Sequence, residues 1–398
     1  MNLLYYTVSD VSPQKGGTER ITHTLCDYFS REFRYHCYLS FSNNLPNYLK
    51  PSTCFNGRIR ICESSNQKII RDFLIKHDIM CVVVQGSYTI VPLFRKAILK
   101  TGKKIPLIFV HHFNPGAETK FNCFDRKRVE LKEELNWKRK IWKLCSIIKL
   151  PATIAYYNWY VRHYYKVAYN NSDKIVLLSH SFINEWCEFA HQKDRRKFEC
   201  IPNALSFSDY LNREDICKKK KQILLVARFS ENQKRIKLAL KLWQLISTNN
   251  HAKGWSFHIV GDGIYKNEYQ KFVKKREIRD VVFHGIQSNT ESFYKDSSIF
   301  LMTSAFEGWG LTITEAQQMG CVPVAFDTYS SLNDIIDDGY NGYIIEDNDI
   351  NGFVQQVIEL IVDNDLRSKI QYNCIDSSKR FSKDIVANRW NALFASIR

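Results

Sequence analysis

Two glutamates eight residues apart, Glu307 and Glu315, are candidates for chemistry because they flank a glycine-broken apolar turn in FEGWGLTITEAQQMG. Gly308 and Gly310 permit a sharp turn and a close backbone approach. The apolar residues that follow have helical spacing, so the turn presents backbone N–H groups at a helix N-terminus, where anions bind. This pattern predicts a ligand with both phosphate and sugar hydroxyls. An ordinary strand–helix turn with two solvated glutamates is the alternative.

Two cations lie in a second segment, VARFSENQKRIKL, in which Arg228 follows a buried strand and Lys234 precedes a helix. An arginine at a strand end and a lysine at a helix start can together hold a diphosphate, the arginine bidentately and the lysine as a point charge. Surface charge in a basic protein is the alternative reading.

Weaker signals follow strands in the first half of the chain. Gly16 and Gly17 lie in a loop before a helix, but the loop is not GxGxxG, so the dinucleotide fingerprint is absent. His111 and His112 end a strand, and adjacent strand residues point to opposite faces, so only one of them can face a ligand. A plain loop and a structural histidine are the alternatives.

The elements that must position these residues are strand-like runs alternating with helical patterns. The runs are near-continuously apolar, as in strands buried on both faces, which predicts parallel sheets built from βαβ units. They fall in two series: residues 2–9, 35–42, 79–86, 105–112 and 174–179, then 222–229, 255–261, 281–285, 298–304 and 322–326. We therefore expect an α/β protein of two doubly wound domains, whose strand ends face each other across a cleft.

Composition limits the class of protein. The 398 residues carry a net charge of +16, which suggests an anionic partner: lipid, nucleic acid or a phosphorylated substrate. No apolar run is long enough to span a membrane, and the first residues are typical of a strand rather than a signal peptide. The twelve cysteines form no CxxC pair, which favours free thiols in a reducing cytoplasm over zinc or disulfides.

Together GGTER, ARFSENQKRIKL, IVGDG and above all FEGWGLTITEAQQMGCVPV resemble the family-4 retaining nucleotide-sugar glycosyltransferases, which have two Rossmann-like domains (GT-B). The resemblance covers nearly the whole chain and is strongest from about 222 to 345. It implies that Glu315 binds the nucleotide ribose and Glu307 the donor sugar. The implied diphosphate ligands are Arg228 and Lys234, with Gly16, Gly17 and the N–H groups around Gly310 and Leu311.

The resemblance also implies that one histidine contacts the donor sugar near its 6-position. Pro115 follows His112 by three residues, as a proline often does in the family, which favours His112 over His111. Trp309 replaces the usual phenylalanine and Ala227 a common glycine, and neither change removes a needed group. The segment 118–170 has no clear counterpart in the family.

Domain roles follow from the same resemblance. Residues 1–204 are expected to form the N-terminal, acceptor-side domain, and residues 205–383 the donor-binding domain. The lysine-rich stretch 205–222 is the expected linker. The C-terminal helix, 384–398, is expected to cross back and complete the first domain.

The predicted activity is retaining transfer of a hexose-type sugar from a nucleotide-diphosphate donor to a saccharide acceptor, with attack by the acceptor hydroxyl on the same face. Two cations already face the phosphates and no DxD-type carboxylate pair follows any of the predicted strands, so neither a metal nor another cofactor is expected. A catalytically inactive nucleotide-sugar binder or scaffold of the same fold remains an alternative. No nucleic-acid-reading module is recognisable.

The segment 120–166 accounts for part of the charge, with 12 Lys/Arg against 4 Asp/Glu. Its apolar residues form a predicted helical stripe: Leu131, Leu135, Trp142, Cys145 and Ile148. Such a helix can lie on an anionic membrane, which fits a lipid-linked acceptor in bacterial polysaccharide synthesis at the inner face of the cytoplasmic membrane. Ordinary core packing of the stripe, with solvated lysines, is the alternative.

Overall fold

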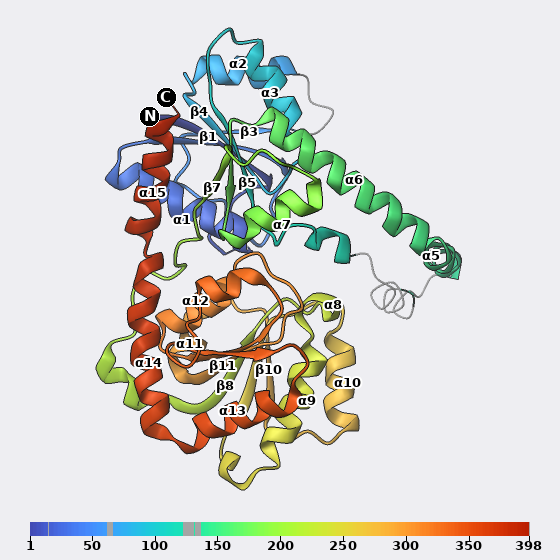
Figure 1. Ribbon diagram of the computed structural model, residues 1–398, viewed down its shortest axis with the longest axis vertical. Coiled ribbons are helices and arrows are strands. Elements are labelled where there is room, and N and C mark those ends of the chain that lie inside the picture. The colour runs from blue at the N-terminus through green and yellow to red at the C-terminus, as the bar shows by residue number, and fades with distance from the viewer. Residues whose placement is uncertain (15, 62–66, 122–130, 132–136, 398) are drawn as a thin grey trace. The chain divides into compact units, whose positions relative to one another are not determined.

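The chain forms two compact units in the computed structural model, which describes all residues except 15, 62–66, 122–130, 132–136 and 398. Unit 1 consists of Met1–Gly116, Asn158–Ser206 and Phe381–Arg398. Unit 2 consists of Ala117–Tyr157 and Phe207–Arg380. Each unit is built around its own sheet (Figure 1).

Within the described residues, unit 1 contains a parallel sheet of seven strands in the order β3-β2-β1-β4-β5-β6-β7. Its strands are β1 (Asn2–Ser9), β2 (His36–Asn43), β3 (Gly57–Arg60), β4 (Cys81–Gln85), β5 (Leu107–His111), β6 (Lys174–Leu177) and β7 (Phe198–Cys200). Every residue of β4 and of β5 is buried, as their apolar runs predict. Successive strands are therefore added on one side of β1 as far as β3, and then on its other side from β4 to β7. The strand order reverses between β1 and β4.

The described part of unit 2 repeats this arrangement with six parallel strands in the order β10-β9-β8-β11-β12-β13. They are β8 (Lys220–Val226), β9 (Ser256–Val260), β10 (Val281–Gly285), β11 (Ser297–Met302), β12 (Val322–Asp327) and β13 (Tyr343–Glu346). In this sheet the strand order reverses between β8 and β11. The prediction of two doubly wound, Rossmann-like α/β domains is thus confirmed.

Helices of unit 1 are α1 (Gly17–Glu32), α2 (Gln67–Lys76), α3 (Val91–Leu99), α7 (Ser181–Ala190) and α15 (Lys383–Ser396). The C-terminal helix α15 packs on α1 within this unit: the Phe29 and Phe394 rings lie 5.9 Å apart, and the Tyr35 hydroxyl donates to Asn391. A further helix, α6 (Leu150–Asn171), begins in unit 2 and continues into unit 1. Pro151 lies in its first turn, where the missing N–H of proline is tolerated.

Helices of unit 2 are α5 (Trp137–Ile148), α8 (Glu231–Lys234), α9 (Ile236–Ser247), α10 (Lys266–Lys275), α11 (Glu291–Asp296), α12 (Leu311–Gln318), α13 (Ile350–Val362) and α14 (Asn364–Ser378). Short 3-10 turns occur at η1 (Ala117–Phe121), η2 (Arg213–Lys218), η3 (Asn250–Ala252), η4 (Ser330–Asp334) and η5 (Lys379–Phe381), the last at the boundary between the units. The stretch expected as a linker is partly folded, since it contains η2 and the start of β8.

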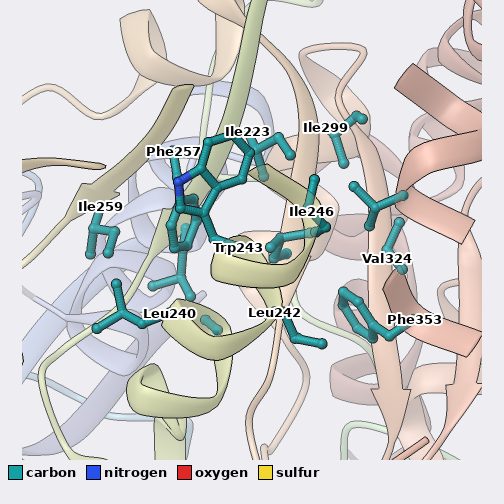
Figure 2. Close-up of a cluster of buried hydrophobic side chains, with 14 of the residues drawn as sticks. Ile223, Leu240, Leu242, Trp243, Ile246, Phe257, Ile259, Ile299, Val324 and Phe353 are labelled. Atoms are coloured by element: carbon teal, nitrogen blue, oxygen red, sulfur yellow. The ribbon is translucent and has the colours of Figure 1, made fainter. Parts of the chain in front are cut away.

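One face of the unit 2 sheet packs on α9, whose apolar side contributes Leu240, Trp243 and Ile246 to a cluster with strand residues (Figure 2). Trp243 is fully buried there, and its indole N–H donates to the Arg279 carbonyl at 2.8 Å. This core holds the strand ends that carry the candidate site. Among the described residues, no helix combines the length and apolar character needed to cross a membrane.

Candidate functional site

The candidate residues of unit 2 cluster at the carboxyl ends of β8 and β11. These strands are neighbours, and the connections that follow them leave the sheet in opposite directions, which is where open α/β sheets bind ligands. Arg228 follows β8, and Glu307 follows β11. The structure therefore brings to one edge two segments that are about eighty residues apart in sequence.

Backbone contacts join the two segments. The Ala305 N–H donates to the Gln233 carbonyl at 2.7 Å, and the Thr303 hydroxyl donates to the Lys234 carbonyl at 2.9 Å. As a result Lys234 Nζ donates to Glu307 Oε1 in an ion pair whose two side chains are only 15% and 11% exposed. The sequence predicted each residue separately, and the structure makes them partners.

Arg228 is exposed at the end of β8, and its guanidinium donates to the Gln233 side-chain oxygen at 3.5 Å. The buried Gln233 in turn donates to the Phe306 carbonyl at 3.4 Å, next to Glu307. Gln233 therefore lies between the arginine and the glutamate and helps to orient both segments.

The glycine turn in IVGDG supports the backbone around Arg228. A Cβ at Gly261 would lie 1.8 Å from the Ala227 carbonyl oxygen, and one at Gly263 would lie 2.5 Å from that of Phe229. Side chains at either position would push β8 and the turn apart. These glycines are thus explained by close packing on both sides of Arg228.

Gly310 caps the N-terminus of α12 in a left-handed conformation with φ of 83°, which favours glycine. A Cβ here would also lie 2.9 Å from the hydroxyl oxygen of Tyr329, which follows β12. That hydroxyl is buried, and no described group hydrogen-bonds to it. Burial, together with the Glu307 carboxylate, raises the pKa of Tyr329 well above its usual value, so it stays protonated. A protonated donor therefore lies beside the helix N-terminus that begins at Leu311.

Glu315 lies on α12 and is 1% exposed. The Tyr294 hydroxyl of α11 donates to Glu315 Oε2 at 3.0 Å. Lys234 pairs with Glu307 and not with Glu315, so the two glutamates have separate partners. Glu307 is paired with Lys234 at the strand ends. Glu315 is in a buried contact with Tyr294, one helical turn inside α12.

In unit 1, His111 and His112 occupy different environments. His111 is almost fully buried on β5, where its Nε2 hydrogen-bonds the Tyr165 hydroxyl at 2.9 Å and its ring contacts Trp186 edge-on at 5.2 Å. Burial, with a smaller effect of His112, lowers the pKa of His111 to about 3. His111 is thus neutral and part of an aromatic core.

His112 lies just past the end of β5, beside the end of β4. Its Nε2 lies 2.6 Å from Gln85 Oε1, an oxygen that can only accept, so Nε2 carries the proton. Burial lowers the pKa of His112 to about 4, so the ring is neutral near pH 7. In that state Nδ1 has a lone pair, and His112 can accept a hydrogen bond from a ligand hydroxyl.

Gly16 caps α1 with φ of −52°, a value open to any residue, and a Cβ there would meet nothing within 4 Å. Neither conformation nor packing within the described chain requires glycine at this position. Gly17 is the first residue of the helix. The unused space at Gly16 is compatible with close approach of a ligand to the N-terminus of α1.

Sequence reasoning missed four residues that support the candidates: Gln85, Gln233, Tyr294 and Tyr329. Two of them had a usable signal, because Gln85 ends an apolar run and Tyr329 comes soon after another. Gln233 and Tyr294 lie within helical segments, and only the tertiary contacts with Arg228 and Glu315 identify them.

A comparison with protein families matches the part of the chain that contains the unit 2 cluster. Residues 207–376, less than half of the chain, match the family model described as glycosyl transferases group 1. This range includes Arg228, Lys234, Glu307 and Glu315, so the matched region contains the whole unit 2 cluster. The match thus supports the broader glycosyltransferase assignment, and membership of family 4 stays a prediction.

Two curated relatives match parts of the chain. The poly(ribitol-phosphate) alpha-N-acetylglucosaminyltransferase of Staphylococcus aureus (strain COL) is 31% identical over 41% of this chain and 33% of its own length. The amylovoran biosynthesis glycosyltransferase AmsD of Erwinia amylovora is 28% identical over 46% of this chain and 50% of its own. The matches thus span a third and a half of these two relatives.

Among solved structures, Anabaena HepE in complex with UDP has a TM-score of 0.73 and 13% sequence identity, and the alignment covers 100% of both chains. At this identity the similarity establishes a shared two-domain fold, that of the GT-B glycosyltransferases.

Proposed function

We propose that this protein is a retaining glycosyltransferase that moves a hexose-type sugar from a nucleotide-diphosphate donor to a hydroxyl of a saccharide acceptor. The observation that carries the proposal is the Lys234–Glu307 pair beside Arg228, at the point where β8 and β11 diverge. The group 1 family match over the same residues supports it.

The charges suggest how donor binding proceeds. A diphosphate placed between Arg228 and Lys234 competes with Glu307 for the lysine. Lys234 then turns to the phosphate, and the released Glu307 carboxylate accepts hydrogen bonds from sugar hydroxyls. One exchange therefore replaces an internal ion pair with two contacts to the donor, one to each of its halves.

Cleavage of the glycosyl–phosphate bond places negative charge on the leaving diphosphate and positive charge on the sugar. Two cations and the N-terminus of α12, with the Tyr329 hydroxyl beside it, are groups that stabilise the leaving group. This set provides the charge that a metal supplies elsewhere, which motivates a metal-independent reaction. Glu315 is the proposed ribose ligand, and reaching it requires that the donor displace or share its contact with Tyr294.

The names of the relatives support the proposed class of acceptor. The names of the matched bacterial proteins refer to transfer of N-acetylglucosamine to poly(ribitol-phosphate) and to amylovoran biosynthesis. We propose that this chain acts in bacterial surface polysaccharide synthesis, and further that its acceptor is lipid-linked and that it works at the inner face of the cytoplasmic membrane. The predicted donor contacts of Gly16, Gly17, His111 and His112 stay predictions.

A screen of radiolabelled nucleotide-sugars against saccharide acceptors, with and without excess EDTA, tests the proposal. We expect transfer from at least one donor, unchanged by the chelator, and NMR should show the donor's anomeric configuration in the product. Donor binding without turnover would favour the inactive binder instead. Transfer abolished by EDTA and restored by Mg²⁺ or Mn²⁺ would contradict metal independence, and an inverted product would contradict retention.

A further inference from the structure

Helix α5 exposes a continuous apolar stripe. Trp137, Ile141, Leu144 and Ile148 follow the i, i+4, i+7, i+11 spacing that places residues on one side of a helix. Their exposed fractions are 66%, 54%, 51% and 73%, and Trp142, on another side of the helix, is 70% exposed. Large apolar side chains gathered in this way on a surface mark a site of interaction. In Figure 1, α5 lies at the N-terminal end of the long helix α6.

The observed stripe differs from the predicted one. The sequence pattern combined Trp142, Cys145 and Ile148 with Leu131 and Leu135, and Leu135 lies outside the described residues. In the structure α5 begins at Trp137, and Ile141 and Leu144 take the central positions of the stripe. The alternative of ordinary core packing does not hold for these side chains, since more than half of each is exposed.

The charged residues of α5 and of the sequence that follows it are all basic. Between Trp137 and Ser172 the sequence contains no Asp or Glu. Lys140 is three residues after Trp137 and four before Leu144, so it borders the stripe, and the exposed Lys149 directly follows Ile148. An apolar stripe edged by lysines and containing tryptophan is the pattern of a helix that lies in the interfacial region of an anionic bilayer.

We propose that α5 docks this protein onto an anionic membrane, with Trp137, Ile141, Leu144 and Ile148 inserted among the acyl chains and Lys140 and Lys149 on lipid phosphates. A second copy of the chain is the less favourable occupant, because pairing α5 with another α5 brings like charges together. A lipid surface covers the stripe and neutralises the lysines in a single contact. The inference deepens the proposed membrane location but stands independently of the donor chemistry.

Sedimentation of the full chain with vesicles tests the docking. We expect binding to phosphatidylglycerol–phosphatidylcholine vesicles, much weaker binding to phosphatidylcholine alone, and weakening as salt rises. The double variant Ile141→Asn/Ile148→Asn should bind at least about tenfold more weakly, because two inserted aliphatic side chains are lost. The matched control Leu99→Asn/Ile286→Asn changes two apolar residues elsewhere that are at least as exposed, and it should bind like the wild type.

Charge is tested by a second pair of variants. Lys140→Gln/Lys143→Gln/Lys149→Gln should weaken vesicle binding by about fivefold per lysine near the surface. Lys271→Gln/Lys274→Gln/Lys275→Gln removes the same charge from α10 and should have little effect. Equal losses of vesicle binding in both triple variants would mean that net charge alone governs the binding. That outcome would contradict the assignment of the membrane contact to α5.

Two further readouts separate the outcomes. Brominated lipids should quench tryptophan fluorescence in the wild type, less so in Trp137→Phe/Trp142→Phe. If instead the stripe variant dissociates an oligomer and the wild type ignores vesicles, α5 is a subunit interface and the proposal is wrong. Nucleotide-sugar affinity and transfer to a soluble acceptor should be unchanged in all α5 variants. Vesicle binding that persists without any transfer would overturn the proposed function alone.

Discussion

Helices α9 and α5 are each twelve residues long, and each carries apolar residues along one side together with lysines. In α9 this side is buried in the unit 2 core, and Trp243 is 0% exposed. In α5 the corresponding side faces outward, and Trp137 is 66% exposed. An amphipathic pattern thus predicts a helix with an apolar face, but it does not say what covers that face.

The same contrast applies to polar groups. Unit 2 buries the amine of Lys219, which donates to the carbonyls of Tyr294 at 2.9 Å and of Ser297 at 2.7 Å. Burial lowers the pKa of this lysine, and the carbonyl acceptors compensate in part for the lost water. A lysine whose amine is enclosed by carbonyls and an exposed tryptophan in one protein show that the neighbours available at each position, and not residue type alone, decide exposure.

The largest effect on stability is expected from truncating a buried side chain of α9. Trp243→Ala should lower the free energy of unfolding by about 3–5 kcal/mol, because it removes a fully buried side chain and leaves a cavity. Trp142→Ala on α5 should change it by less than about 0.5 kcal/mol. Urea unfolding of the two variants measures both values, and similar losses would show that α5 is packed after all.

Next in size is the effect of removing a site cation. Arg228→Ala should lower kcat/KM for the donor by tens- to hundreds-fold, equivalent to about 2–4 kcal/mol, through lost stabilisation of the leaving diphosphate. Glu315→Ala should weaken donor binding by a similar factor. Lys140→Ala on α5 also removes a cation and should leave both quantities unchanged. Wild-type kinetics in the two site variants would refute the unit 2 site.

A smaller effect is expected at Gln85, which holds the ring of His112. Gln85→Leu removes the acceptor of the Nε2 proton, at a cost of about 1 kcal/mol, and should raise the donor KM about fivefold. Nitrogen-15 NMR of the histidine ring should show the Nε2-protonated tautomer in the wild type and a mixture in this variant. Gln85→Glu keeps an acceptor oxygen and should restore that tautomer. An unchanged NMR signature in Gln85→Leu would mean that Gln85 does not set the tautomer.

The smallest effect on stability is expected at Tyr329. Tyr329→Phe removes a buried hydroxyl for which no described group is a partner, so the free energy of unfolding should change by less than about 0.5 kcal/mol. If the hydroxyl binds the donor phosphate, as its place beside Gly310 suggests, nucleotide affinity should fall by about five- to tenfold. Thermal melts and nucleotide titration separate the two quantities, and unchanged affinity would leave Tyr329 outside the site.

Much of the fold was predictable because the buried parallel strands have unbroken apolar runs. The predicted ranges 2–9 and 281–285 coincide with β1 and β10. Strands β3, β7 and β13 were missed because they are three or four residues long, and GRIR in β3 has no apolar run. Such edge strands are specified largely by pairing with a neighbour, which local sequence does not reveal.

The sequence by itself determined the two parallel sheets and the positions of Arg228, Lys234, Glu307 and Glu315 after strands, because apolar periodicity and glycine turns are local properties of the chain. Only the tertiary structure decided that Lys234 pairs with Glu307, that Tyr294 holds Glu315 and that Gln85 sets the tautomer of His112. It also decided that α9 is buried and α5 exposed. These outcomes depend on contacts between residues far apart in the chain, whose distances no local pattern contains.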